Sequence, residues 1–170
     1  MQTPVRRVDH RAGWLRWLTI GALVAGTLDI LYAIGFSYAR SGVAPSRILK
    51  SVAAGAFGGA AFEGGAGMAA AGLGFHFLNA FLITAAFFLV ASRLPGLRRR
   101  PVPIGALYGL FVYGVMNYVV IPLSAIGPRP LPPTAIWVTG VLVHMFLIGV
   151  PIALAARQAL GPGTTPAAIF

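Results

Sequence analysis

The chain contains no cysteine, which excludes disulfide bonds, thiolate catalysis and cysteine-ligated metal centres. It is also poor in charge: only 9% of its 170 residues are Asp, Glu, Lys or Arg, whereas a soluble domain carries roughly 25%. Hydrophobic residues make up 58% of the chain, so polar side chains could not cover its surface in water. The composition therefore places the protein in the integral membrane class.

Recognised catalytic motifs are absent as well. The sequence contains no H-E-x-x-H, G-x-S-x-G or G-x-x-x-x-G-K-[ST] pattern, and each of these patterns marks a specific catalytic or phosphate-binding arrangement. We therefore expect a protein that is not an enzyme. The net charge of +10 comes largely from arginines that flank apolar segments, a pattern typical of membrane anchoring. We therefore expect no nucleic-acid partner.

Four apolar stretches have the length of a membrane span, for which about 20 residues are needed. They are residues 14–38, 67–92, 102–121 and 134–156. The first contains Asp29 and lacks a small-x-small cleavage site, so it reads as a retained helix rather than a signal peptide. The sequence predicts an all-α integral membrane four-helix bundle in one domain, residues 14–160. Residues 1–13 would be a basic cytoplasmic N-terminus and residues 161–170 a flexible C-terminal tail.

The distribution of basic residues predicts the orientation of the bundle. If both termini are cytoplasmic, the inner segments hold nine arginines: Arg6, Arg7, Arg11, Arg16, Arg93, Arg98, Arg99, Arg100 and Arg157. The outer segments hold four basic residues: Arg40, Arg47, Lys50 and Arg129. This excess predicts a multi-pass membrane protein with both termini cytoplasmic, N-in and C-in. Interfacial or lipid contacts are expected of Trp14, Trp17, Arg98, Arg99, Arg100 and Trp137.

The segment between the first two spans, residues 45–66, is too polar at its start to cross a membrane and too apolar for a solvated loop. It predicts a short amphipathic helix at the membrane surface or a re-entrant segment. The two functions left open for it are a shield for the bundle and a lid.

Short sequence elements recur in the two halves of the chain. "IGAL" occurs at residues 20–23 and 104–107, "SGVAP" at 41–45 is similar to "SAIGP" at 124–128, and G-x-x-x-H occurs at 72–76 and 140–144. The pattern predicts two parallel helical-hairpin repeats, an arrangement found among transporters. In such a repeat His76 and His144 lie at equivalent depths.

Few polar side chains lie inside the predicted spans. Counted from the outer helix ends at 1.5 Å per residue, they fall in the outer half of the bilayer: Asp29, His76, Asn79, Asn117 and His144, with Tyr113 on the stripe of Asn117. An ionised side chain in hydrocarbon costs roughly 2.5–3.5 kcal/mol or more, so such groups face the bundle interior or a wet cavity. We therefore expect a polar layer built by all four helices.

Small residues on the same helix faces predict close helix contacts, above all the Gly105-x-x-x-Gly109 pattern. The bulky residues of the second span would then face lipid or neighbouring subunits. These are Phe75, Phe77, Phe81 and Phe88.

Three interpretations of the polar layer stay open. In the first, the cluster binds or relays a proton, an ion or a small ligand. In the second, the protein is an accessory or structural subunit of a larger membrane complex, and its polar residues form interhelical hydrogen bonds averaging ~0.6 kcal/mol. In the third, His76 and His144 hold a haem b, or the same two residues with Asp29 bind a metal ion. The expected partners are the lipid bilayer and other membrane subunits or a second copy of the chain.

Several stretches are similar to a known group of proteins. They are "AGTLDILYA" at 25–33, "PSRILKSVAAG" at 45–55, "GLGFHFLNA" at 72–80 and "GVMNYVVIPLSA" at 114–125. They resemble a family of small, uncharacterised four-helix inner-membrane proteins of bacteria. The resemblance extends from the first span to the fourth. It implies the architecture and the location, and no mechanism.

Overall fold

The computed structural model describes residues 10–130 and 132–163, and within them all regular structure is helical. Two spans are unbroken α-helices, α1 (His10–Ser41) and α3 (Ala66–Arg93). The third runs from α4 (Pro101–Val115) through η3 (Met116–Val120) into α5 (Ile121–Leu123). The fourth runs from α6 (Thr134–Val143) through η4 (His144–Gly149) into α7 (Val150–Leu160).

In the described part of the chain, four helical spans are long and apolar enough to cross a membrane: Gly13–Ser41, Ala66–Arg93, Pro101–Leu123 and Thr134–Leu160. The prediction of an all-helical fold with four helices long and apolar enough to span a membrane is therefore confirmed. Most of the predicted N-terminal segment, residues 1–9, and most of the predicted tail, residues 164–170, lie outside the described residues.

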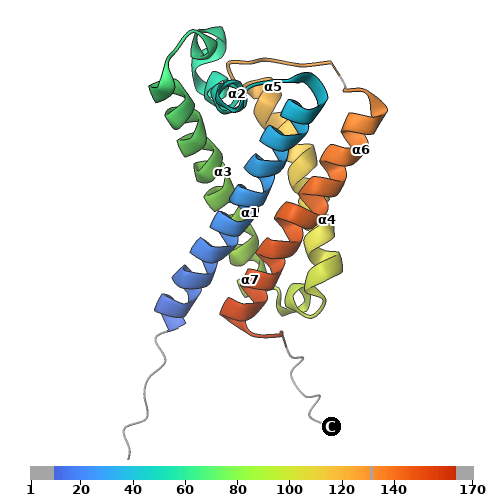
Figure 1. Cartoon of the computed structure of the whole chain (residues 1–170). Helices are drawn as coiled ribbons and strands as arrows, with labels where there is room; N and C mark the ends of the chain where they lie inside the picture. Colours follow the sequence, from blue (N-terminus) through green and yellow to red (C-terminus); the bar gives the residue numbers. More distant parts are fainter. Residues whose placement is uncertain (1–9, 131, 164–170) are drawn as a thin grey trace, which may run out of the picture.

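The bundle has two distinct ends, which Figure 1 shows. At the η2 end, η2 (Pro95–Arg98) joins α3 to α4, and α1 begins and α7 ends there. At the α2 end lie α2 (Pro45–Phe57), η1 (Gly58–Phe62) and α5. The start of α1 and the end of α7 lie on the same side because the number of spans is even.

The four spans are not equally well packed against one another. α1 packs against both α3 and α7, while α4 packs against η4 and α7. α3 and α4 are consecutive spans, yet they are not among the closely packed pairs of helices. The arrangement therefore runs α3, α1, α7, α4 and leaves a seam between α3 and α4.

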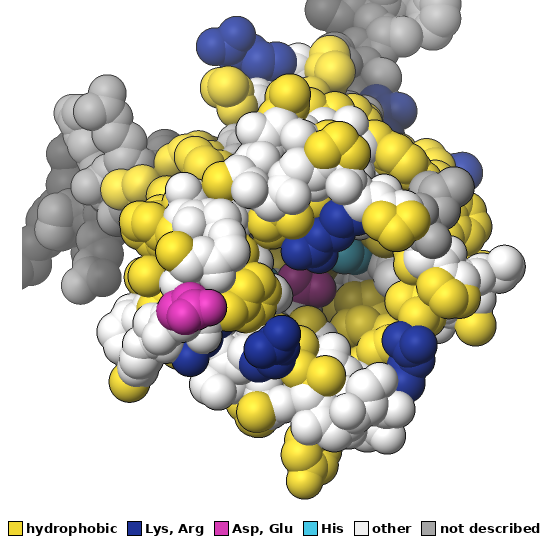
Figure 2. Space-filling view, turned by 90° about the horizontal axis from the view of Figure 1, so that it is seen from above, with side chains coloured by type: hydrophobic (Ala, Val, Ile, Leu, Met, Phe, Trp, Pro, Cys, Tyr) yellow, Lys and Arg dark blue, Asp and Glu magenta, His cyan; other side chains and the backbone are white. Residues whose placement is uncertain are grey.

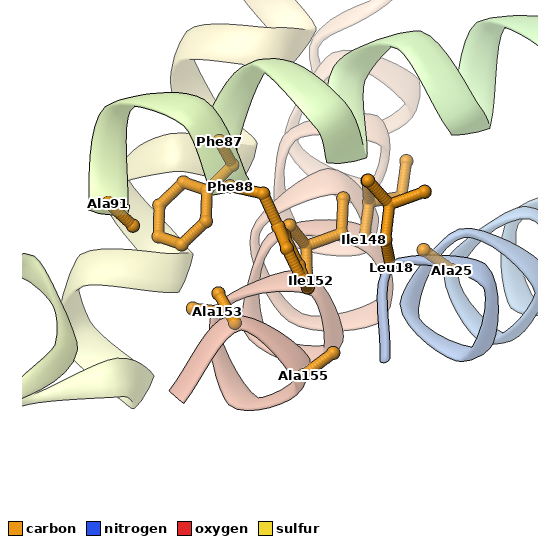
Figure 3. Packing of buried hydrophobic residues seen from close by; sticks show 10 residues of the cluster. Leu18, Ala25, Phe87, Phe88, Ala91, Ile148, Ile152, Ala153 and Ala155 are labelled. Atoms are coloured by element: carbon orange, nitrogen blue, oxygen red, sulfur yellow. The ribbon is translucent and has the colours of Figure 1, made fainter. Parts of the chain in front are cut away.

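The apolar core lies toward the η2 end, where α1, α3 and α7 meet (Figure 3). Phe88 and Ile152 are its largest fully buried side chains, and Trp14 packs edge-on against Phe88 with ring centroids 5.7 Å apart. The prediction that Phe88 faces lipid is therefore wrong. A run of apolar residues does not reveal which side of a helix is covered, because both lipid and core accept phenylalanine.

Two helical spans contain a π-helical segment, and both segments precede a proline. η3 ends two residues before Pro122, and η4 ends two residues before Pro151. A proline inside a helix lacks the N–H donor, and its ring clashes with the carbonyl four residues earlier. Those carbonyls belong to Tyr118 and Leu147, which lie within the two π segments. The wider π turn is a common way to absorb such a break.

Glycines allow α4 to approach η4 at the backbone level. A methyl group at Gly105 would lie 2.7 Å from the carbonyl oxygen of Gly149, and one at Gly109 would lie 2.6 Å from the Cα atom of Met145. Both approaches are shorter than side-chain carbons tolerate. The close contact predicted from Gly105-x-x-x-Gly109 is confirmed, and its partner is the segment that carries His144.

A helix, α2, occupies much of the segment predicted between the first two spans. It packs against α3 so closely that a Cβ atom on Gly72 would lie 2.7 Å from the carbonyl carbon of Leu49 and would overlap the carbonyl oxygen. At its other end, the amide of Ala125 donates to the carbonyl of Gly55 at 2.9 Å. α2 is therefore fixed to the bundle by contacts with α3 and with the residues that follow α5.

Arginines at the end of η2 and just after it hold the end of α7 and the residues that follow it. The Arg98 guanidinium donates to the carbonyls of Leu160 and Gly161, and Nε of Arg99 donates to Gly163 at 2.9 Å. Cations suit this position because the terminal carbonyls of a helix lack intrahelical partners. Arg98 was expected at lipid headgroups, but it is only 9% exposed, whereas Arg100 remains exposed.

Candidate functional site

A cavity of about 190 Å³ lies inside the bundle, and Val52 of α2 lines it together with residues of all four spans. Four of the six predicted polar residues line it, and they come from three spans: Asp29, His76, Asn79 and His144. We call it the Asp29 cavity. Figure 2, which looks onto the α2 end, shows a hollow that contains an acidic and a histidine side chain, with basic side chains around its rim.

His76 is held in place by a hydrogen bond between α3 and α1. Its Nε2 atom lies 2.8 Å from the carbonyl oxygen of Gly26. Since a carbonyl oxygen can only accept, Nε2 carries the proton of this bond. Nδ1 of a neutral His76 is therefore a hydrogen-bond acceptor.

His144 also donates to a backbone carbonyl, but through Nδ1 rather than Nε2. Its Nδ1 atom lies 2.9 Å from the carbonyl oxygen of Gly140, one turn earlier in the same span, so Nδ1 is the donor. The ring of Tyr113 packs edge-on against the imidazole with centroids 5.1 Å apart. Nε2 of a neutral His144 is thus the second free acceptor nitrogen contributed by a residue that lines the cavity.

Asp29 has no hydrogen bond or ion pair with any residue in the described part of the chain. Among those residues, Nε of Arg98 is the only side-chain nitrogen or oxygen that is fully buried and has no hydrogen-bond partner. Since the Asp29 carboxylate also lacks a partner, it is not fully buried and is accessible to water. Its surroundings are mostly apolar, with Val52, Ile83 and Val112 in the cavity wall. The structure meets the interpretation of the cluster as interhelical hydrogen bonding in part, because His76 bonds from α3 to the backbone of α1 whereas Asp29 accepts from neither histidine. Both imidazoles instead donate to backbone carbonyls.

The other two predicted residues, Tyr113 and Asn117, do not line the Asp29 cavity. They line a second cavity of about 420 Å³, together with Arg129, Trp137 and His144, which we call the vestibule. The Asn117 amide donates to the carbonyl of Tyr113 at 2.9 Å, within its own span, so it does not bond across the bundle. His144 lines both cavities and is therefore part of the wall between them.

The geometry gives no support to a resident metal ion or haem. No three His, Asp or Glu side chains among the described residues are placed to hold a metal ion together. Pockets for drug-sized ligands typically span ~300–1,000 Å³, and the cavity that His76 and His144 share is about 190 Å³. That volume suits a small solute or a few waters and does not fit a porphyrin between the two imidazoles.

The polar groups that line the Asp29 cavity are mainly hydrogen-bond acceptors. Its polar lining offers a carboxylate, two imidazole nitrogens that accept when neutral, and the amide of Asn79. Among the described residues, no lysine or arginine lines it. The cavity is therefore complementary to a proton, a cation or a small hydrogen-bond donor.

Two features of the site were missed by reasoning from the sequence. Val52 of α2 lines the cavity, so the segment between the first two spans contributes to the site. His144 and Asn117 lie in the two π segments, and π segments are frequent at functional sites. The prolines inside the apolar spans were the available signal.

Comparison with protein-family models, curated proteins and solved structures finds no match for the chain. The resemblance to a family of bacterial inner-membrane proteins therefore stays a prediction.

Proposed function

We propose that this chain is a small, non-enzymatic protein of the bacterial inner membrane that binds or relays a proton, a cation or a small hydrogen-bond donor in the Asp29 cavity. The observation that carries the proposal is the unpaired, water-accessible carboxylate of Asp29 within mostly apolar surroundings. A charge at this depth is costly unless it is paired or hydrated. A bound proton or cation would relieve that cost directly.

We also propose that the η2 end faces the cytoplasm. From residue 13 onward, the η2 side of the described chain carries six arginines, which are Arg16, Arg93, Arg98, Arg99, Arg100 and Arg157. The α2 side carries Arg40, Arg47, Lys50 and Arg129. The positive-inside rule favours the richer side as cytoplasmic. The cavity then lies near the outer surface, with α2 beside it as an interfacial helix or lid.

The parallel repeat is part of the same proposal. It relates His76 on α3 to His144 on the fourth span, and both residues line one cavity. The two spans differ locally, because α3 is a regular α-helix at His76 whereas His144 begins a π segment. This difference matches the proline that follows His144 and has no counterpart in α3.

The test uses purified protein in lipid nanodiscs. Thermal unfolding is followed with sodium, potassium, ammonium and methylammonium chloride, and infrared difference spectra record carboxyl protonation as the pH is lowered. We expect one of these cations, or the proton, to give a response that Asp29→Asn lacks. A ligand at 100 times its Kd stabilises the folded state by about 2.7 kcal/mol.

The matched control is Glu63→Gln, which removes the same charge from an exposed residue near α2. It should respond to every cation as the wild type does and should keep the infrared signal that Asp29→Asn loses. If the wild type and Asp29→Asn behave identically toward all cations and toward pH, the proposal is refuted.

A further inference from the structure

The seam between α3 and α4 holds an apolar groove that opens to the membrane side of the bundle. Tyr108 bridges the two helices: its hydroxyl donates to the carbonyl of Ile83 at 2.5 Å, and its ring lies 4.8 Å from that of Phe87. The groove, of about 240 Å³, is lined by residues that include Ala86 and Phe111. Phe111 is 63% exposed, as expected for a side chain in contact with lipid.

The groove and the Asp29 cavity share a wall. Ile83, Val112 and Met116 line both spaces, so the separation is one layer of side chains. Met116 is the first residue of the π segment η3, and methionine is unbranched and adapts readily to different neighbours. A rotation of this one side chain is the simplest way to connect the groove with the cavity.

The two routes into the cavity differ in charge. Basic side chains surround the hollow at the α2 end (Figure 2), and a positive rim lowers the local concentration of cations. The seam carries no charged residue in the groove lining. A cation that approaches the cavity from the water side is therefore repelled by the basic rim, whereas one that approaches through the groove is not. To reach the groove from the membrane, the cation must carry an apolar tail.

We propose that the Asp29 cavity binds the ammonium head of a single-chain amphiphile, and that the alkyl chain leaves through the seam at Met116 into the groove between α3 and α4. The inference rests on the proposed function and specifies its ligand class. The ammonium group supplies a positive charge for Asp29 and N–H donors for its carboxylate and for the free imidazole nitrogens of His76 and His144. The same chemistry is found in lipid-derived amines and in free alkylamines.

The cavity volume sets the chain length at which the groove becomes necessary. A water-sized group occupies about 30 Å³, so 190 Å³ holds an ammonium group and roughly five methylenes. Shorter alkylammonium ions fit entirely within the cavity. Longer ones must place their remaining carbons in the groove.

The test measures binding of ethyl-, butyl-, octyl- and decylammonium to the protein in nanodiscs of one lipid composition. Three variants are compared: Asp29→Asn, Ala86→Phe, which fills the groove without touching the cavity lining, and Ala70→Phe, which adds the same bulk at another exposed position of α3. Comparing variants in identical nanodiscs cancels partitioning of the amines into lipid.

We expect Ala86→Phe to bind ethyl- and butylammonium as the wild type does and to bind octyl- and decylammonium roughly tenfold more weakly, about the loss of two buried methylenes. Ala70→Phe should match the wild type throughout. Retained binding of the short ions also shows that Ala86→Phe is folded.

Two results would overturn the inference. If Asp29-dependent binding exists but Ala86→Phe leaves all four affinities unchanged or lowers them equally, the chain does not use the seam, and the proposed function stands. If no alkylammonium ion binds in an Asp29-dependent way, the ligand class is wrong. The proposed function is then decided by the separate responses to protons and inorganic cations.

Discussion

A single methyl group at Gly109 tests the contact that positions His144. In Gly109→Ala the new Cβ atom would lie 2.6 Å from the Cα atom of Met145 and closer still to the carbonyl oxygen of His144. Real Cβ atoms essentially never approach below 3.0 Å, so the Met145 contact alone requires α4 and η4 to separate by about 0.4 Å, and the nearer His144 carbonyl requires more. The obstacle is backbone on a packed helix, which cannot rotate away as a flexible side chain would.

The size of the effect is best read against Gly114→Ala, where nothing lies within 4 Å of the added methyl group. Both glycines are in α4, so both substitutions gain about 0.5–1 kcal/mol from the better helix propensity of alanine. Only Gly109→Ala carries the cost of overpacking, typically ~1–3 kcal/mol. We therefore expect Gly109→Ala to be less stable than Gly114→Ala by about 1–3 kcal/mol.

The measurement is reversible unfolding of both variants in mixed micelles, with the free energy of unfolding extrapolated to the absence of denaturant. Gly114→Ala should be as stable as the wild type or slightly more stable. Gly109→Ala should also weaken any Asp29-dependent binding, because His144 moves with the segment. Equal free energies of unfolding for the two variants would show that α4 and η4 are not in backbone contact. That contact would then not be what positions His144.

Two further predictions concern the ends of the bundle. Gly72→Ala should release α2 from α3, because its methyl group would overlap the Leu49 backbone, whereas the methyl group of Gly74→Ala has open space around it. Limited proteolysis within α2 should be faster in Gly72→Ala only, and equal cleavage rates in the two variants would contradict the contact. Arg98→Ala should lower the free energy of unfolding by roughly 1.5–3 kcal/mol through the loss of charged hydrogen bonds to Leu160 and Gly161. Substitution of the exposed Arg100, Arg100→Ala, should leave the free energy of unfolding within about 0.5 kcal/mol of the wild type. A similar loss of stability in Arg98→Ala and Arg100→Ala would show that the effect comes from net charge and not from the hydrogen bonds.

The level of the polar residues could be predicted from the sequence because depth in a helix is a local property. A rise of 1.5 Å per residue places Asp29, His76 and His144 at similar distances from the helix ends. The structure brings these three, with Asn79, around one cavity. Tyr113 and Asn117 were assigned to the same layer, yet they line the vestibule, because the rotation of a helix about its axis depends on its neighbours.

The hydropathy of the chain alone was enough to predict four helices, since each apolar stretch must satisfy its own backbone hydrogen bonds within a membrane. Which helices meet was decided by contacts between residues far apart in the chain. Gly105 and Gly109 bring α4 onto η4 rather than onto α3, and this choice opens the seam beside Met116. Phe88 is buried and Arg98 caps α7 for the same reason: the faces of α3 and η2 are assigned only when α1 and α7 pack against them. Composition and periodicity carry no information about that pairing, so only the tertiary structure places a cavity behind Asp29 and a membrane-facing groove next to it.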